Sequence, residues 1–173
     1  MSGHVVVDAR DDSDLAECAE VLGAVHRADG YPVNWPADPE GWLRVDGAVG
    51  AWVARLDGRV AGHVLLARPR PVDVAPRLAP PERPTCVVGR LFVAPAARGR
   101  RIGARLLERA AREAARRGGA RAVLDVVPRD VAAVALYERA GWTFLGAGQQ
   151  EWGPGELVDV RCYAASPKSE ETP

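Results

Sequence analysis

The sequence contains little lysine and little cysteine. Lys168 is the only lysine among 23 basic residues, so nearly all of the positive charge is arginine, and a single arginine is weak evidence of function. The three cysteines, Cys18, Cys86 and Cys162, are widely spaced and have neither Cys-x-x-Cys spacing nor matching histidines. This pattern indicates neither a disulfide framework nor a zinc site, and we expect no metal.

The sequence also lacks a long apolar run. No segment is apolar over the length that a bilayer requires, and no charged-then-apolar leader begins the chain, so we expect a cytoplasmic protein without a membrane partner. With 173 residues, 47% of them apolar, and a formal net charge of zero, the chain fits one soluble domain that is not a general polyanion binder. We expect this domain to span residues 1–165 and a disordered tail to span 166–173.

One stretch changes its hydrophobic period abruptly, between positions 87 and 118. Its first part is rich in β-branched and aromatic residues and ends at Pro95, which predicts a buried strand. Apolar residues then recur at helical spacing from Ile102 until the pair Gly118 and Gly119. The segment Arg98–Ala104 therefore lies at a helix N-terminus, where free amides and the positive end of the helix dipole favour an anion such as phosphate or carboxylate.

Two familiar phosphate-binding motifs do not fit this turn. A nucleoside-triphosphate loop requires lysine after its last glycine, and no lysine follows any glycine here. A dinucleotide fingerprint requires three glycines in the pattern G-x-G-x-x-G, whereas the turn has glycine only at Gly99 and Gly103. A basic turn that simply opens a solvated helix is the alternative interpretation.

A second strand and helix follow downstream. Residues 122–127 read as a strand, and Asp130 and Gly141 are suited to begin and end a short helix between them. Upstream, the pair Asp57 and Gly58 predicts a hairpin between two antiparallel strands. A segment with six prolines, residues 68–85, predicts a surface excursion that is partly mobile.

The stretch 87–118 and the strand and helix that follow it, up to Trp142, together resemble the GCN5-related N-acetyltransferase (GNAT) superfamily. The acyl-CoA turn of that family reads [QR]-x-x-G-x-[GA] after a strand ending L-x-V-x-P, and the matching residues are Leu91, Val93, Pro95, Arg98 and Gly103. Its later segment reads N-x-x-A-x-x-L-Y-x-x-x-G-[FW], and the matching residues are Ala133, Leu136, Tyr137, Gly141 and Trp142. Arg101 stands where the turn has its first glycine, and we expect it to keep helical φ and ψ. Asp130 replaces the usual asparagine.

The resemblance implies an α+β fold with a mixed, mostly antiparallel central sheet and helices on both faces. It also implies an N-acetyltransferase that moves an acetyl group from acetyl-CoA to a primary amine by direct attack in a ternary complex. Tyr137 is the implied general acid, which protonates the leaving thiolate. The implied cofactor-binding residues are Leu91, Phe92, Val93, Arg98, Gly99, Arg100, Arg101, Ile102, Gly103, Ala104, Asp130 and Ala133. Gly89 would ease the bulge that the family has in its acyl-CoA strand.

The acceptor side is less determined. The resemblance places the segment after the first helix beside the acceptor, where Tyr31 and Trp35 are suited either to form a lid or to pack the loop onto the core. The general base stays open among Asp125, His63, Glu151 and a water relay. The sequence leaves open a small-molecule amine or a peptide as acceptor, a homodimer, and acceptor contacts from the proline-rich segment.

Two other classes of function remain. A non-catalytic acyl-CoA sensor would keep the phosphate turn and tolerate loss of Tyr137, yet this tyrosine is present. An arginine stripe along the predicted helix, at positions 105, 109, 112 and 116, would suit a nucleic-acid-binding module. No interleaved aromatic residues accompany it, so we expect a solvated face and no nucleic-acid partner.

Overall fold

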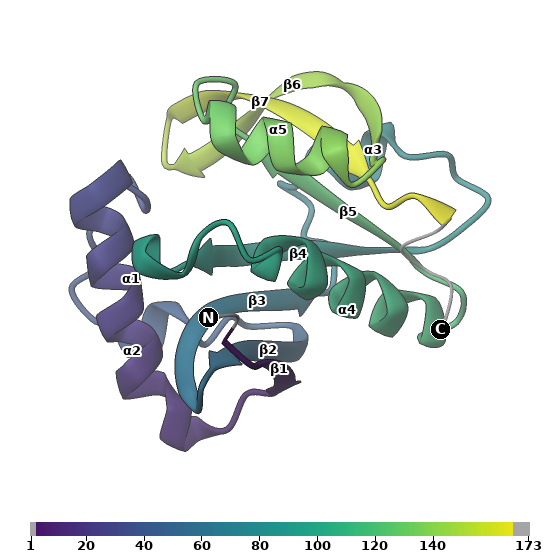
Figure 1. Cartoon of the computed structure of the whole chain (residues 1–173). Helices are drawn as coiled ribbons and strands as arrows, with labels where there is room; N and C mark the ends of the chain where they lie inside the picture. The colour runs from purple at the N-terminus through teal and green to yellow at the C-terminus, as the bar shows by residue number, and fades with distance from the viewer. Residues whose placement is uncertain (1–2, 168–173) are drawn as a thin grey trace. The chain divides into compact units, whose positions relative to one another are not determined.

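The computed structural model describes residues 3–167 and contains seven strands in one mixed sheet (Figure 1). The strand order is β1-β2-β3-β4-β5-β7-β6. Strands β4 and β5 pair in parallel, and the neighbours β1–β2, β2–β3, β5–β7 and β6–β7 pair antiparallel. This arrangement confirms the predicted mixed, mostly antiparallel sheet.

The chain forms two compact units. The first contains the chain up to Ala67 together with Gly89–Arg109, and the second contains Arg68–Val88 together with the chain from Ala110 onward. Strand β4 (Thr85–Val93) and helix α4 (Ile102–Arg116) each contribute residues to both units. Among residues 3–167, no helix has the length and apolar character needed to cross a membrane.

The first unit is built from β1 (Val5–Ala9), β2 (Ala48–Leu56), β3 (Arg59–Ala67) and the second half of β4, with α1 (Leu15–Asp29) and the short α2 (Pro39–Trp42). The predicted hairpin joins β2 to β3, and Asp57 and Gly58 both have positive φ, as a type I′ turn requires. The core combines one face of α1 with strand residues and consists of Leu15, Cys18, Leu22, Val25, Leu43, Val53, Val60 and Phe92.

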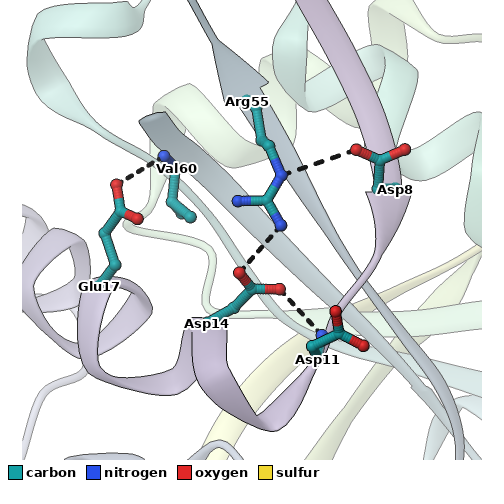
Figure 2. Close-up of polar contacts among 6 residues, drawn as sticks. All are labelled: Asp8, Asp11, Asp14, Glu17, Arg55 and Val60. Carbon is teal, nitrogen blue, oxygen red and sulfur yellow. Dashed lines mark hydrogen bonds and ion pairs between the residues drawn. The ribbon is translucent and has the colours of Figure 1, made fainter. Parts of the chain in front are cut away.

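Charged side chains fix the start of α1 on this sheet (Figure 2). Arg55 on β2 pairs with Asp14 at 2.9 Å and with Asp8 at 3.6 Å, and Asp14 also accepts a hydrogen bond from the backbone N–H of Asp11. Glu17 accepts from the backbone N–H of Val60 at 2.8 Å. Burial alone would raise the pKa of Asp14, but the Asp11 N–H and Arg55 outweigh it and lower that pKa. These contacts anchor a helix start and have a structural role.

The second unit contains the first half of β4, β5 (Arg121–Val126), α5 (Val131–Arg139), β6 (Thr143–Gly153) and β7 (Glu156–Ala164). The proline-rich segment supplies α3 (Ala75–Leu78). Val74 and Ala75 are buried against Val123, Val160 and alternate residues of β7. Tyr163, which has the opposite orientation on β7, contacts Tyr137 of α5. Because successive strand residues face opposite sides, α3 and α5 cover opposite faces of this part of the sheet.

Candidate functional site

The turn between β4 and α4 lies in the first unit and follows the predicted outline. Strand β4 ends at Val93, a short 3-10 turn covers Pro95–Ala97, and α4 begins at Ile102. The Ala94 N–H donates to the Ala61 carbonyl at 2.8 Å and fixes the exit from the strand. Ile102 and Leu106 are buried under the sheet, which leaves the preceding basic residues at the surface.

Two residues of this turn have left-handed backbone conformations. Gly99 has φ 82° and Arg101 has φ 62°. The expectation that Arg101 keeps helical φ and ψ is therefore wrong. A non-glycine residue in this conformation costs roughly 1–2 kcal/mol, so the turn is held in a strained form at the position where the family motif has glycine. Such strain is characteristic of ligand-binding segments.

The start of α4 has no acceptor from its own sequence. Arg101 precedes the first helical residue, and a guanidinium can only donate hydrogen bonds. The amides of Ile102, Gly103 and Ala104 belong to the first turn, where no intrahelical acceptor exists. Arg100 and Arg101 are exposed beside them. The amide donors, the positive end of the helix dipole and the two arginine charges therefore all favour the binding of an anion at this helix start.

Arg98 has a partner within the first unit. Its guanidinium forms an ion pair with Asp29, the last residue of α1, and both side chains are nearly half exposed. The pair joins the end of α1 to the basic turn. An exposed pair of this kind is weak because water competes for both groups, so Arg98 can exchange Asp29 for a stronger anion.

A close approach between β3 and α4 fixes the helix start. A Cβ atom added to Gly62 would lie 3.1 Å from Ile102, from Leu106 and from the Phe92 carbonyl. Glycine at this position therefore lets the first turn of α4 rest directly on the sheet.

Strand β4 is bent at Arg90, not at Gly89. Arg90 has φ 52° inside the strand, and Gly89 is not among the residues with positive φ. The bend is held by β3: His63 Nδ1 lies 2.8 Å from the Arg90 carbonyl oxygen, and the His63 ring stacks on Phe92 at 5.1 Å. Leu91 and Val93, which follow the bend, are half buried and Phe92 is buried.

The last residue of α2, Trp42, places an aromatic ring next to Arg90, and the loop between α1 and α2 supplies Tyr31 and Trp35. The Arg90 guanidinium lies 3.7 Å from the centre of the Trp42 ring, and its Nε donates to the Trp42 carbonyl at 3.1 Å. Tyr31 contacts Trp42 edge to face at 6.2 Å and packs against the first core. Trp35 is 43% exposed and lies 5.2 Å from the His26 ring. Tyr31 and Trp35 therefore have different surroundings, although the sequence suggested the same role for both.

In the second unit, α5 has the predicted cap. Asp130 accepts a hydrogen bond from the Ala133 N–H at 3.2 Å, which satisfies an amide of the first turn. Tyr137 is 7% exposed, and its ring lies 6.3 Å from Trp142 and 5.8 Å from Tyr163. The Tyr163 hydroxyl donates to Glu138 and accepts from Arg161. Tyr137 thus belongs to a buried aromatic group of α5 and β7.

The three candidate bases differ in environment. His63 is fully buried, burial lowers its pKa to about 4, and Arg10 occupies its second ring nitrogen. Glu151 is exposed and accepts from the Gly155 N–H. Asp125 is half buried on β5, and burial and next the charge of Asp73 raise its pKa. Only Asp125 combines a raised proton affinity with partial exposure.

The described part of the chain offers neither a metal site nor a reactive thiol. No three His, Cys, Asp or Glu side chains in residues 3–167 are grouped as metal ligands would be. Burial raises the pKa of Cys18 to about 12 and that of Cys162 to about 11, and it also raises that of Cys86. All three thiols are therefore protonated near neutral pH, and a protonated thiol is a poor nucleophile.

Sequence reasoning missed Trp42 and Arg90, and it did not give His63 its partners. Nothing in the motif marks a left-handed residue at position 90. The residues that His63 contacts lie 53 positions before it and 27 positions after it, so no local pattern could have found them.

The fold is similar to those of several solved acetyltransferases. NAA60 from Arabidopsis thaliana, in complex with acetyl-CoA, aligns with a TM-score of 0.69 and 18% identity over 93% of this chain and 98% of its own. The putative acetyltransferase yncA from Salmonella typhimurium, with its cofactor acetyl-CoA, gives 0.64 and 21% over 92% of each chain. The ribosomal-protein-S18-alanine N-acetyltransferase from Escherichia coli gives 0.66 and 17% over 94% and 93%. No curated protein sequence matches the chain. At these identities the likeness shows the fold alone, which is the α+β fold that these proteins share.

The sequence also identifies the family. The chain belongs to the acetyltransferase (GNAT) family, whose model matches residues 14–142. This span contains the bent strand β4, the basic turn before α4, and Tyr137 with its capped helix. The chain is thus a member of the GNAT acetyltransferases, as the resemblance implied.

Proposed function

We propose that this acetyltransferase transfers the acetyl group of acetyl-CoA to the primary amine of a small molecule, which attacks the thioester directly in a ternary complex. The observation that carries the proposal is the start of α4, where a strained basic turn presents amides without an acceptor of its own. We propose residues 1–165 as the acyltransferase domain.

The pyrophosphate of the coenzyme is the anion that we assign to this turn. The proposed binding residues are Arg98, Gly99, Arg100, Arg101, Ile102, Gly103 and Ala104. Hydrogen bonds from charged donors and main-chain amides to phosphate are among the strongest that proteins make. Binding would also break the ion pair of Arg98 with Asp29, because the diphosphate as a whole carries two negative charges and the carboxylate carries one.

The pantetheine arm resembles a peptide and can pair with a strand as an added strand would. We propose that Leu91, Phe92 and Val93 supply this edge, and that an amide following the Arg90 bend donates to the thioester oxygen. Negative charge develops on that oxygen as the amine attacks, and a fixed amide stabilises it in the transition state. Asp130 and Ala133, the residue whose amide Asp130 caps, are further proposed binding residues for the coenzyme.

Tyr137 is the proposed general acid. The tetrahedral intermediate expels a thiolate, and a phenol with a reference pKa of ~10 can protonate it. The motif match and the burial of the Tyr137 ring beside Trp142 and Tyr163 support this role. The protonated state of all three cysteines supports direct attack over an acetyl-cysteine intermediate.

An alkyl ammonium acceptor must lose a proton before it attacks. We propose Asp125 for this step, directly or through water, because its carboxylate has a raised pKa and is partly exposed. Tyr31 and Trp35 remain proposed acceptor contacts, Trp35 with the more exposed ring. The proline-rich segment 68–85 is a further proposed acceptor contact.

Acceptors of two kinds occur among the structural relatives. One relative is described as a putative phosphinothricin N-acetyltransferase and another is the ribosomal-protein-S18-alanine N-acetyltransferase. At 17% identity each shows the fold alone, so peptide amines are the second acceptor class to test. A homodimer is a further proposal that the same preparation can test by light scattering.

Thiol release from acetyl-CoA, measured across polyamines, aminoglycosides, amino acids and peptide N-termini, tests the proposal. Calorimetric titration with coenzyme A alone accompanies it. We expect coenzyme A to bind and at least one small amine to accelerate thiol release above the rate in water. Release only with peptides would move the function to protein acetylation. Binding without release would indicate a sensor, and absence of binding would reject the assignment of the turn.

A further inference from the structure

We propose that His63, oriented by Arg10, is a positioning residue for acetyl transfer, because it holds the bent peptide of β4 and thereby aims the Leu91 amide. The inference rests on the proposed function of β4. It concerns Arg10, which directly follows β1, together with residues of β3 and β4, and all of them belong to the same unit.

The hydrogen bonds around His63 define its tautomer. Nδ1 lies 2.8 Å from the Arg90 carbonyl oxygen, which can only accept, so Nδ1 carries the proton. Nε2 must then be the acceptor, and Arg10 Nη1 donates to it at 2.9 Å. The ring is fully buried and stacks on Phe92 with an interplanar angle of 14°. Each polar atom of the imidazole therefore has one partner, and the ring has a single orientation.

The bond to Arg90 has a consequence for the next residue. The carbonyl of Arg90 and the N–H of Leu91 belong to one planar peptide group and point in opposite directions. When His63 holds the carbonyl, it also fixes the direction of the Leu91 N–H, which points away from His63. At a bulge the strand ladder no longer determines this direction. The buried imidazole replaces the ladder at this peptide.

Arg90 is held from its side chain as well. The guanidinium stacks on Trp42 and donates to the Trp42 carbonyl, and Arg10 donates to the next carbonyl, that of Leu43, at 2.8 Å. Arg10 therefore connects His63 to the end of α2. The backbone of Arg90 is left-handed at φ 52°, a conformation that persists only where its surroundings enforce it. Arg90 is thus held at two points, by His63 at its carbonyl and by Trp42 at its guanidinium.

Substitution of His63 by phenylalanine separates this role from packing. The H63F ring keeps the stacking partner Phe92, but it cannot donate to Arg90 or accept from Arg10. We expect kcat to fall about 10- to 100-fold. The Kd for coenzyme A should change much less than kcat, because the 98–104 turn assigned to the pyrophosphate has no contact with His63. H63N places an amide donor near the position of Nδ1, so we expect it to recover most of kcat.

Glu17→Ala is the matched control. Glu17 also bonds the main chain of β3, through the Val60 N–H (Figure 2), and its loss should destabilise the same unit without reaching Arg90. We expect kcat per folded molecule to stay at the wild-type value in E17A. Equal losses of kcat in H63F and E17A, or no loss in H63F, would overturn the proposal and leave His63 as a core residue.

Two readouts need no substrate and separate this inference from the proposed function. Amide hydrogen exchange over residues 90–93 should be faster in H63F than in wild type and E17A. Stability should also differ with pH. The pKa of His63 lies below its unfolded value of about 6.5, so the unfolded chain binds the extra proton between pH 6.5 and 4. Its charged neighbours are Arg10 and Arg90, which both disfavour a protonated ring.

The wild-type urea midpoint should therefore fall more steeply below pH 6.5 than that of H63F. If exchange is faster in H63F although the wild-type protein acetylates nothing, the proposed function is rejected, but His63 is still the residue that fixes the peptide between Arg90 and Leu91. Unchanged exchange and an unchanged pH profile would reject the positioning role, even in an active enzyme.

Discussion

The two helices that follow parallel strands begin in different ways. Helix α5 is closed by its own sequence, because the Asp130 carboxylate accepts from the Ala133 amide. Helix α4 begins at a left-handed arginine that cannot accept a hydrogen bond, and further arginines surround its first turn. A closed N-terminus stabilises its helix by about 1 kcal/mol. An open one gives up this stability and remains available to an external anion.

The difference assigns different tasks to the two segments. The start of α4 can act through its main chain and its positive charge, which suits a diphosphate whatever group is attached to it. In helix α5 the Asp130 carboxylate already satisfies the Ala133 amide, so we expect its contribution to come from a side chain, and Tyr137 is the side chain that the family motif selects. Closing the start of α4 should therefore affect coenzyme A binding, and removing the Tyr137 hydroxyl should affect turnover.

Gly103→Glu closes the open helix and should have the largest effect. The substitution puts a carboxylate in the first turn of α4, where it satisfies free amides and repels phosphate. We expect coenzyme A affinity to fall by about 100-fold or more, equivalent to roughly 3 kcal/mol, as measured by calorimetric titration.

Arg116→Glu is the control for G103E, since it adds negative charge to the exposed far end of the same helix. It should leave the affinity within a factor of two. Circular dichroism must show that G103E retains its helices. A folded G103E protein that binds coenzyme A as the wild type does would place the diphosphate elsewhere.

The strand and helices that this comparison involves can be predicted from the sequence. A change from strand to helix spacing around Pro95, the capping residue Asp130 and the terminal glycine Gly141 are local signals, and local signals predicted β4, α4 and α5. The hairpin at Asp57 and Gly58 was predicted for the same reason. These elements depend on residues within a few positions of each other.

The remaining features depend on tertiary contacts. Arg90 and Arg101 adopt left-handed conformations that arginine rarely adopts by itself, so the surrounding structure determines them. Val74 and Ala75 are buried although the prolines around them indicate a surface segment, because a four-residue helix becomes stable only through what it packs against. His63 appeared as an isolated strand histidine since its partners are far away in the sequence.

Tyr137→Phe tests the contribution of α5 and should have the next largest effect. It removes one hydroxyl from a buried ring and leaves the main chain of the helix intact. If thiolate protonation limits the rate, kcat should fall about 100-fold while coenzyme A affinity stays unchanged, as measured by steady-state thiol release and calorimetry.

Tyr163→Phe is a close control for Y137F. Tyr163 lies 5.8 Å from Tyr137, and its hydroxyl bonds Glu138 and Arg161, so its loss should lower stability by about 1 kcal/mol and leave kcat within a factor of two. Equal turnover of Y137F and wild type in single-turnover experiments would remove the role of Tyr137 as the acid.

Asp29→Asn removes the ion-pair partner of Arg98 beside the start of α4 and should have the smallest effect. In the free protein Asp29 holds Arg98, and coenzyme A must displace it, so the variant removes a competitor of the phosphate. The pair is exposed and therefore weak, and we expect affinity to rise only about two- to fivefold at low salt. The gain should shrink as ionic strength increases, because salt screens exposed charges.

In the Arg98→Gln background the same substitution should have no effect, which titrations of both single variants and the double variant can measure. A gain that persists without Arg98 would mean that Asp29 repels the coenzyme directly rather than by occupying the arginine.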